Sequence, residues 1–559
     1  MSRPTATGAG DGNIGRDSAA MAAGSVASRI LGVVRQSLIT LAIGQGLVAN
    51  AFTTANTLPN IIYLLLAGGV LNSVLVPQIV KATASEDGGR DYTDRLITIA
   101  LSGLLVVTVV ATLGAGLLVR AYAQNLTGSL LELAVFFALI TLPQIFFYGV
   151  YGLLGQVLTA RGRFAAYGWA PAMANLVAII GLLAFMRLYQ GHVTASEWTP
   201  AMVWWFAGTA TLSIVAQALI LIVPLWRSGF RWRPRFGLRG VGLGTTSKVA
   251  GWALASLTVS QLGYLVASTV MWHATGSDEA ARPAGAPFVA GTTIHANAIL
   301  VFMVPHGLVV VSLLTALYPR ISRAVQTRDD PRLRHDYLRG LTIPAVVTIP
   351  AAVAFVVFAL PIMGLLFTSR DPAEVPAAAA ALAFMAPALL PFGIDALNQR
   401  MFYAFETGRT AFAEQLIVTT TASLVTVGAI WLRPEWTVPI IGVAMVVSNA
   451  IGAAFGMRRV RRLIGPYGAQ RAARTWTRVL LASAGAGYVA WGVVILLTRA
   501  TATWGRLGHA ATLVIGGLLF TVVYLLLARL LRIEEIGTIA APVVNRLDRR
   551  PPGRHRPGD

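Results

Sequence analysis

Residues 28–81 carry the stretch on which the fold assignment depends, SRILGVVRQSLITLAIGQGLVANAFTTANTLPNIIYLLLAGGVLNSVLVPQIVK. It is apolar enough for two membrane-spanning helices, and the first of them contains Arg29 and Arg35. A charge near the bilayer centre costs about 2.5–3.5 kcal/mol on insertion scales, so an intramembrane arginine is expected to face protein or a wet cavity. Six helical residues place the two guanidinium groups about 120° apart around the axis and about 9 Å apart along it. We therefore predict that both arginines flank one polar space without touching each other.

Each arginine has a simpler alternative explanation. Arg29 lies near the start of an apolar run that begins near Ala19, so its side chain can snorkel to the cytoplasmic surface as an anchor. The same explanation is weaker for Arg35, because apolar chain extends on both sides of it.

The composition identifies a polytopic membrane protein. Of the 559 residues 56% are hydrophobic and 12% are charged, and the mean hydropathy is +0.68. Soluble proteins carry about 25% charged residues. The net charge of +21 would suggest a nucleic-acid partner in a soluble chain, but here we expect none, because the basic residues must first be placed relative to the bilayer. The absence of cysteine excludes disulfides, thiolate metal sites and cysteine nucleophiles.

Apolar runs of about 20 residues predict an all-α protein with fourteen transmembrane helices. Pro59, Pro143, Pro305 and Pro391 are positions where the longer runs are expected to kink. The expected limits of the spans are 18–44, 46–80, 94–122, 130–160, 164–189, 199–226, 246–273, 288–319, 338–368, 376–405, 410–432, 437–457, 475–498 and 508–531.

The distribution of basic residues supports this count. If both termini are cytoplasmic, most of the 44 Lys and Arg residues fall in the tails and inside loops, as the positive-inside rule requires. The first seventeen residues lack a cleavable signal pattern, so we expect the first helix to lead insertion. The arginines expected outside are Arg120, Arg187, Arg282, Arg370, Arg433, Arg499 and Arg506.

Two short matches suggest an internal duplication. LPN at Leu58 is echoed by VPH at Val304, and GRFAA at Gly162 by GRTAF at Gly408, with one common offset. Parallel repeats of this kind build many alternating-access transporters. We predict two six-helix lobes in a pseudo-two-fold arrangement, followed by two extra helices. The expected parts are a cytoplasmic tail at 1–17, the N-terminal lobe at 18–226, a basic linker at 227–245, the C-terminal lobe at 246–457, a basic loop at 458–474, the last two helices at 475–531 and a basic tail at 532–559.

No catalytic, nucleotide or metal motif is present. The chain lacks G-x-x-x-x-G-K-[ST] and H-E-x-x-H, so we expect neither an enzyme nor a bound cofactor or metal. Within the tenth span, Asp395 and Asn398 are candidates for a coupling site that binds a cation or a proton. The alternative is a hydrogen-bonded carboxylate that serves helix packing.

Asparagines gather in the second span, next to the arginine-bearing helix. Any one of them is explained by interhelical hydrogen bonding. Their concentration favours a hydrated interior, and a cationic cavity favours an anionic substrate because Arg binds phosphate through charge-assisted hydrogen bonds. The asparagines are Asn50, Asn56, Asn60 and Asn72.

Several motifs, in this order, resemble the MurJ/MviN lipid II flippases of the MOP superfamily, in their actinobacterial form. The motifs are SRILGVVRQ from Ser28, AFTTANTLPNIIYLLLAGG from Ala51, VLVPQI from Val74, PQIFFYGVYGLLGQVLTARGRFAAYGWAPAMANL from Pro143, PHGLVVVSLLTALYPRISRAV from Pro305 and RMFYAFETGRTAF from Arg400.

The resemblance implies a bacterial cytoplasmic-membrane protein that exports lipid II for peptidoglycan synthesis, driven by membrane potential or an ion gradient. It implies that Arg29 and Arg35 contact the diphosphate-sugar head and that the last two helices form a groove for the polyprenyl tail. The expected substrate-binding set is completed by Ser28 of the SRILGVVRQ motif and by Asn50, Asn56 and Asn60. Anionic lipids are expected partners of the basic tail, and cell-wall synthesis or division proteins are further candidates.

The chain departs from the family pattern at several charged positions. Asn50 stands for an aspartate, Tyr63 for an arginine and Gly68 for a glutamate, and an expected Asp-Arg pair is apolar around Leu300. Two alternatives therefore stay open. The first is an exporter of another polyprenyl-linked glycan precursor or of a drug, although the cationic cavity speaks against a drug cation. The second is a non-transporting scaffold of the cell-wall machinery.

Overall fold

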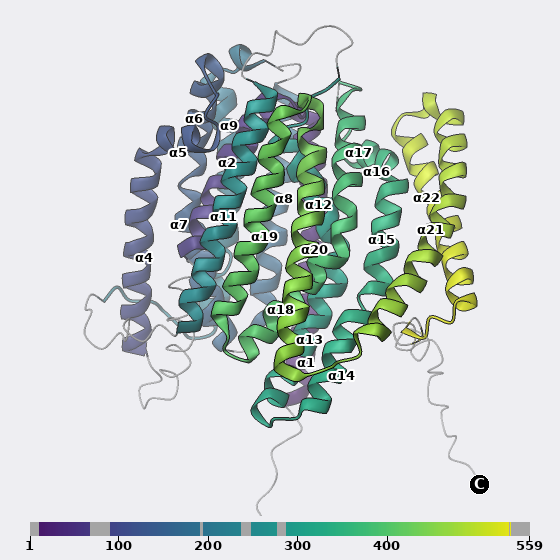
Figure 1. Ribbon diagram of the computed structural model, residues 1–559. Coiled ribbons are helices and arrows are strands. Elements are labelled where there is room, and N and C mark those ends of the chain that lie inside the picture. Colours follow the sequence, from purple (N-terminus) through teal and green to yellow (C-terminus); the bar gives the residue numbers. More distant parts are fainter. Residues whose placement is uncertain are drawn as a thin grey trace, which may run out of the picture. The chain divides into compact units, whose positions relative to one another are not determined.

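The structure, a computed structural model, describes residues 10–66, 90–161, 163–189, 194–235, 248–276, 287–369, 371–535 and 537. Within these ranges every regular element is a helix, and thirteen helical segments are long and apolar enough to cross a membrane (Figure 1). These thirteen coincide with thirteen of the predicted spans. The predicted second span corresponds to α2 (Leu47–Leu66), which falls outside this set because asparagines and threonines interrupt its apolar chain. The all-α prediction is confirmed, and residues 67–80 of the second span lie outside the described ranges.

The chain divides into two compact units, here called unit 1 and unit 2. Unit 1 comprises residues 1–300, 366–381 and 408–444, and unit 2 comprises residues 301–365, 382–407 and 445–559. The boundaries run through α12 (Thr292–Pro305), α16 (Ala359–Leu366), α17 (Glu374–Met385) and α20 (Thr437–Ile464). The division into two six-helix lobes stays a prediction.

Unit 1 contains the helices that carry the arginines and asparagines discussed above. Its helices are α1 (Gly10–Ile43), α2, α4 (Arg90–Leu113), α5 (Ala115–Tyr122), α6 (Gly128–Thr141), α7 (Gln144–Ala160), α8 (Phe164–Leu188), α9 (Pro200–Leu219), α10 (Ile222–Arg227), α11 (Lys248–Thr275) and α19 (Gly408–Gly428). Its core includes an edge-to-face aromatic cluster in which Phe52 of α2 lies 5.4 Å from Phe137 of α6 and 4.7 Å from Phe206 of α9.

A close helix crossing holds α1 against α8. A Cβ atom on Gly24 would lie 2.7 Å from the carbonyl oxygen of Gly168, and one on Gly168 would lie 2.8 Å from the Cα of Met21. The indole of Trp169 donates a hydrogen bond to the carbonyl of Ala20 at 3.0 Å. Small residues at a crossing let the two backbones approach, which is how membrane helices gain packing without a hydrophobic driving force. The arginine-bearing helix is therefore fixed to α8 along its first half.

Hydrogen bonds between distant segments of unit 1 join helix ends that the topology predicts to lie outside. The backbone N–H of Gln45, after α1, donates to Oε1 of Glu374 at the start of α17, at 3.1 Å. Nδ2 of Asn297 in α12 donates to Oε1 of Gln45 at 2.8 Å. The backbone N–H of Thr293 at the start of α12 donates to Oδ1 of Asn50 at 2.9 Å. The predicted alternation brings all of these helix ends to one side of the bilayer, so their contact agrees with it.

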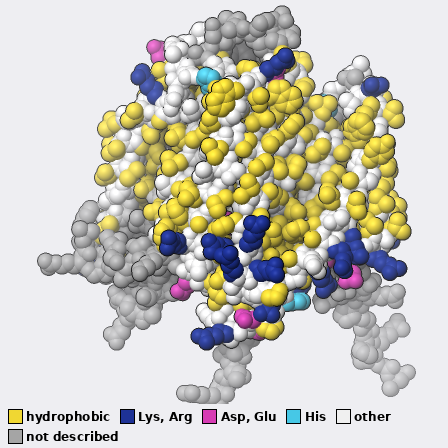
Figure 2. Space-filling view, in the orientation of Figure 1, with side chains coloured by type: hydrophobic (Ala, Val, Ile, Leu, Met, Phe, Trp, Pro, Cys, Tyr) yellow, Lys and Arg dark blue, Asp and Glu magenta, His cyan; other side chains and the backbone are white. Residues whose placement is uncertain are grey.

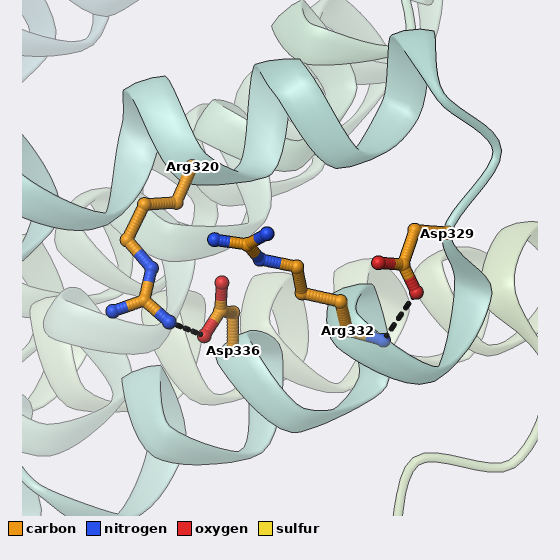
Figure 3. A network of polar contacts seen from close by, with 4 residues as sticks. All are labelled: Arg320, Asp329, Arg332 and Asp336. Carbon is orange, nitrogen blue, oxygen red and sulfur yellow. Dashed lines mark hydrogen bonds and ion pairs between the residues drawn. The ribbon is translucent and has the colours of Figure 1, made fainter.

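Unit 2 contains α13 (Val311–Gln326), α14 (Asp330–Thr342), α15 (Ala345–Val357), α18 (Leu389–Ala404), α21 (Ala469–Ala500) and α22 (Arg506–Leu530). Arg320 in the middle of α13 donates to the carboxylate of Asp336 in the middle of α14 at 2.7 Å, and Asp329 caps α14 by accepting from the backbone N–H of Arg332 (Figure 3). Asp336 is fully buried, while the Arg320 side chain is 43% exposed. The helix sides are covered mainly by hydrophobic side chains, and Lys and Arg gather near helix ends (Figure 2).

The four prolines expected to kink long spans behave differently. Pro59 lies inside a continuous α2, and Pro143 separates α6 from α7. Pro305 is followed by a π-helical turn, η4 (His306–Val310). The tenth span breaks at a 3₁₀ turn, η5 (Ala386–Ala388), and Pro391 lies in the first turn of α18, where a missing N–H is tolerated.

Candidate substrate-binding site

A cavity of about 70 Å³ lies inside unit 1 between α1, α2, α7, α8 and α9. Its polar lining comes from Arg35, Asn56, Gln144, Tyr148 and Ser213, among others, and the rest of the lining is mainly apolar. A water molecule occupies about 30 Å³ in the liquid, so a polar space of this size is large enough for water. The second span thus contributes one of its asparagines, Asn56, to the lining of a polar cavity.

Gln144 fixes the polar wall of this cavity. Its Nε2 donates to Oδ1 of Asn56 at 3.2 Å and to Oγ1 of Thr211 at 3.1 Å. The hydroxyl of Thr211 in turn donates to the carbonyl of Ile140 at 2.8 Å. These bonds tie α2, α7 and α9 together around the cavity and hold the Asn56 and Gln144 amides in place.

Arg35 supplies the charge of the cavity. Its Nε is buried and has no hydrogen-bond partner among the described residues, and none of the residues lining the cavity is acidic. A buried guanidinium without a carboxylate is costly, because the desolvation of the charge is not offset by a counter-charge. The arrangement therefore favours an anionic group or water as the partner of Arg35.

Tyr148 connects the cavity to Tyr63, a position at which the resemblance led us to expect an arginine. Its ring stacks on Tyr63 with centroids 5.7 Å apart and planes 25° apart. The Tyr63 hydroxyl occupies the space above Gly152, so close that a side chain there would require Tyr63 to shift. Tyr63 is thus packed against α7, and Arg35 is the charge that lines the cavity.

The other predicted substrate-binding residues are not gathered in this cavity. Arg29 and Asn60 are exposed. Ser28 accepts hydrogen bonds from Nδ2 of Asn175 in α8, through its carbonyl at 2.9 Å and its Oγ at 3.3 Å. Asn50 is 2% exposed, and its side chain serves the first turn of α12. Asn72 lies outside the described residues.

The predicted binding set lacked Thr209 and Ser213 of α9 and Gln144 and Tyr148 of α7, which all line the cavity. Gln144 and Tyr148 lie four residues apart, and residues at this spacing share one face of a helix. A polar residue directly after Pro143, followed by an aromatic hydroxyl one turn later, was the available signal.

The candidate coupling residues lie in unit 2 on α18. Asp395 is 5% exposed and Asn398 is fully buried. Oδ1 of Asn398 accepts from the hydroxyl of Tyr337 at 2.7 Å, and Nδ2 donates to the carbonyl of Ala453 at 3.5 Å. Asn398 therefore joins α18 to α14 and α20. No group of three or more metal-ligating side chains is found in the part of the chain that the structure describes.

Comparison with known families decides the assignment of the chain. A family model described as "Lipid II flippase MurJ" matches residues 39–516, which is most of the sequence. The chain belongs to the MurJ family. The resemblance seen in the motifs is thereby confirmed.

Individual relatives agree with MurJ membership. The chain is 26% identical over 410 residues to a "Probable lipid II flippase MurJ" of Synechocystis sp., covering 71% of this chain and 72% of the relative. It is 26% identical over 496 residues to a "Probable lipid II flippase MurJ" of Vibrio cholerae serotype O1, covering 85% and 88%.

Solved structures share the fold at low sequence identity. The structure titled "Lipid II flippase MurJ, inward closed conformation" matches with a TM-score of 0.67 and 17% identity, over 91% of this chain and 98% of the other. An inward-facing MATE transporter of the MOP superfamily matches with a TM-score of 0.62 and 18% identity, over 78% and 95%. The chain therefore shares the helical fold of these MurJ and MATE structures.

Proposed function

We propose that this MurJ-family protein moves lipid II from the inner to the outer leaflet of the bacterial cytoplasmic membrane by alternating access, with both termini in the cytoplasm. Its role would be transport for cell-wall synthesis rather than catalysis. The observation that carries the proposal is the guanidinium of Arg35, buried in a polar cavity without an acidic neighbour in its lining. A diphosphate fits such a site, since its oxygens accept charge-assisted hydrogen bonds from arginine.

The hydrogen-bonding groups around Arg35 suit a sugar or peptide head. Asn56, Gln144, Tyr148 and Ser213 offer donors and acceptors on the same cavity wall. The cavity volume of about 70 Å³ is far below that of a whole lipid-linked disaccharide. Arg35 is therefore proposed to hold the diphosphate end, while the remaining head lies beyond this cavity. Arg29, which is exposed on the same helix, is the second proposed contact.

An apolar groove in unit 2 supports a polyprenyl-linked substrate. It measures about 390 Å³ and is bordered by α15, by the η5 and α18 segment and by α21. Its lining is Ile349, Ala352, Val353, Val356, Pro387, Leu390, Pro391, Ala473, Trp476, Thr477 and Leu480. Apart from the indole and hydroxyl of Trp476 and Thr477 the lining is hydrocarbon, and the indole is occupied by the carbonyl of Leu341 at 3.0 Å. Branched hydrocarbon chains fit such a surface, so α21 is proposed to receive the lipid tail.

The energy for transport is proposed to come from membrane potential or an ion gradient, because the sequence carries no nucleotide-binding motif. Asp395, with Asn398 on the same helix, is the proposed place of ion coupling. The basic helix ends and tail suit anionic lipid headgroups of the cytoplasmic leaflet. Cell-wall synthesis or division proteins stay proposed partners.

A second candidate function is export of a different polyprenyl-linked glycan. It is favoured by the uncharged Asn50 and Tyr63, which occupy positions where the family carries charges. The two functions share the Arg35 cavity and the tail groove, and they differ in the sugar. Mass spectrometry of the lipid that purifies with the protein distinguishes them.

The test of the proposed function is depletion of the protein in its native host, followed by measurement of externally accessible lipid II. Wild type is expected to restore lipid II at the outer surface, and Arg35→Ala is expected to fail. Arg187→Ala, which removes an exposed arginine at the end of α8, is the matched control and should rescue. Full rescue by the Arg29→Ala/Arg35→Ala double variant would refute head-group binding by these arginines. If cavity variants are silent while a deletion is lethal, the protein acts as a scaffold.

A further inference from the structure

A π-helical turn interrupts a membrane span in unit 2. From Val301 the chain runs to Pro305 and then into η4, His306–Val310, before α13 begins. Pro305 cannot donate a backbone hydrogen bond, which accounts for the local change of helix type. π-helical turns are rare, and they occur frequently at functional sites. The first residue of this turn, His306, lies between the apolar runs 298–305 and 307–311.

His306 is buried against α18. It is 5% exposed, and its ring centroid lies 4.6 Å from that of Phe392. The Phe392 ring also contacts Phe302, one turn before His306, at 5.8 Å. The imidazole therefore packs against an aromatic ring of α18 in the interior of unit 2.

Asp395 lies on the same stretch of α18. It follows Phe392 by three residues, so it is one helical turn from the ring that covers His306. Asp395 is also 5% exposed. An acidic side chain buried within a membrane span is costly and marks a functional site by default, together with the polar partner nearest to it.

The helices packed around η4 offer few other ionisable groups. They are α13, α15 and α18. The sequence of α15 contains none, and α13 reaches its first at Tyr318, twelve residues after His306. On α18 the other candidates are Arg400, whose guanidinium lies over the Tyr318 ring at 5.3 Å, and Tyr403. Among the described ionisable side chains of α13, α15 and α18, Asp395 is thus the one that lies within a helical turn of Phe392, the residue that contacts His306.

Asn398 does not complete a site for a metal cation at Asp395. Both ends of its amide are engaged in interhelical hydrogen bonds, with Tyr337 and Ala453. Hard cations such as Ca²⁺ and Mg²⁺ need about six oxygen ligands. One helical turn from Asp395, the Phe392 ring contacts the imidazole of His306 and the ring of Phe302 instead of further oxygen ligands. This chemistry suits a proton rather than a metal ion.

We propose that His306 and Asp395 together form a proton-binding site of unit 2. With the proton bound, the imidazole and the carboxyl group share it and the pair is neutral overall. Release of the proton to water leaves a neutral imidazole and an ionised carboxylate, which is costly to keep buried within a membrane span. That change favours a conformation in which the site is hydrated. The coupling role of the site rests on the proposed transport function, while the binding of the proton does not.

The existence of the site is tested without any substrate. Infrared difference spectra of the purified full-length protein are recorded as the pH is raised from about 5 to 8, the range in which histidine titrates. Wild type is expected to show imidazole and carboxyl bands that change with one common midpoint. Asp395→Asn should remove the carboxyl band and move the imidazole midpoint by about one pH unit, and His306→Gln should move the carboxyl midpoint by a similar amount.

Reciprocity between the two groups decides the outcome. His295→Gln removes another partly buried imidazole, on α12, and should leave the Asp395 band where it is in wild type. An Asp395 midpoint that His306→Gln does not move would overturn the proposal. So would a wild-type spectrum without a titrating carboxyl band, a result that does not depend on whether any variant folds.

The coupling role is tested separately in proteoliposomes. Wild-type transport of lipid II should accelerate under an imposed pH gradient, and His306→Gln and Asp395→Asn should lose this acceleration while His295→Gln keeps it. If wild type transports no lipid II but the reciprocal titration is observed, the proposed substrate is wrong and the proton site stands. If lipid II moves and both variants respond to the gradient like wild type, the coupling role is wrong and the proposed function stands.

Discussion

Placing an alanine at position 152 tests how the cavity wall is packed. In α7, Gly152 lies directly under the hydroxyl of Tyr63, closer than a Cβ atom can normally approach another atom. The Tyr63 ring cannot simply swing away, because it is stacked on Tyr148. We expect Gly152→Ala to lower the free energy of unfolding by about 1–3 kcal/mol, the usual cost of overpacking a filled site.

A second substitution identifies the atom responsible. Without the hydroxyl, the nearest Tyr63 atom to the added Cβ would be Cζ, at 3.5 Å, which is an ordinary van der Waals contact. Tyr63→Phe should therefore relieve most of the cost of Gly152→Ala, with a coupling energy of about 1–2 kcal/mol between the two sites. Gly208→Ala in α9 is the matched control, because no other atom lies within 4 Å of its added Cβ. We expect it to change stability by no more than about 0.5 kcal/mol.

The assay is a double-mutant cycle of unfolding in mixed micelles, with all variants titrated under one set of conditions. If Gly152→Ala costs as much in the Tyr63→Phe background as in wild type, Tyr63 does not pack on α7 as described.

Three further outcomes follow from buried contacts. Arg320→Leu should lower the free energy of unfolding by about 1–3 kcal/mol, because it leaves the buried carboxylate of Asp336 without its partner arginine. Asp336→Leu should lower it less, because the half-exposed Arg320 can turn to water. Equal losses for the two variants, measured by denaturation, would contradict this. Glu374→Leu should lower the free energy of unfolding by about 1–3 kcal/mol, because it leaves the backbone N–H of Gln45 without its acceptor. Glu374→Gln keeps an acceptor oxygen and should lower it clearly less in the same titration. Gly24→Ala should separate α1 from α8 and lower the thermal midpoint, and an unchanged midpoint would show that the two backbones are not in contact.

The number and order of the helices were predictable from the sequence, and the reason is physical. A membrane span must be long and apolar, and the basic loops must alternate, so each segment carries its own signal. The same rule explains α2, which was expected from its position although its asparagines and threonines make it the least apolar span. Its polar side chains are used by Gln144 and by the start of α12.

The composition of the site was predictable only in part. The charge cost identified Arg35 correctly as a residue that faces a polar cavity. The same argument gave Arg29 a cavity position, but in unit 1 its side chain is exposed. Which face of a helix is buried depends on its neighbour, and α1 is set against α8 by the glycine crossing at Gly24, a long-range contact that no local pattern contains.

Asn50 and Tyr63, where the resemblance led us to expect charged residues, both pack closely against neighbouring helices. This packing bears on whether the protein is an active transporter. Asn50 accepts the backbone N–H of Thr293 and lies flat on Gly291, where a larger side chain on the glycine would not fit. Tyr63 fills the space over Gly152. Neither residue leaves an empty space beside it in the packing. Empty spaces would be expected if an unused site had been lost by mutation. The cavity instead combines one guanidinium with a hydrogen-bonded polar wall and no acidic residue in its lining, which favours an anionic group. The packing of these residues therefore favours a transporter over a scaffold.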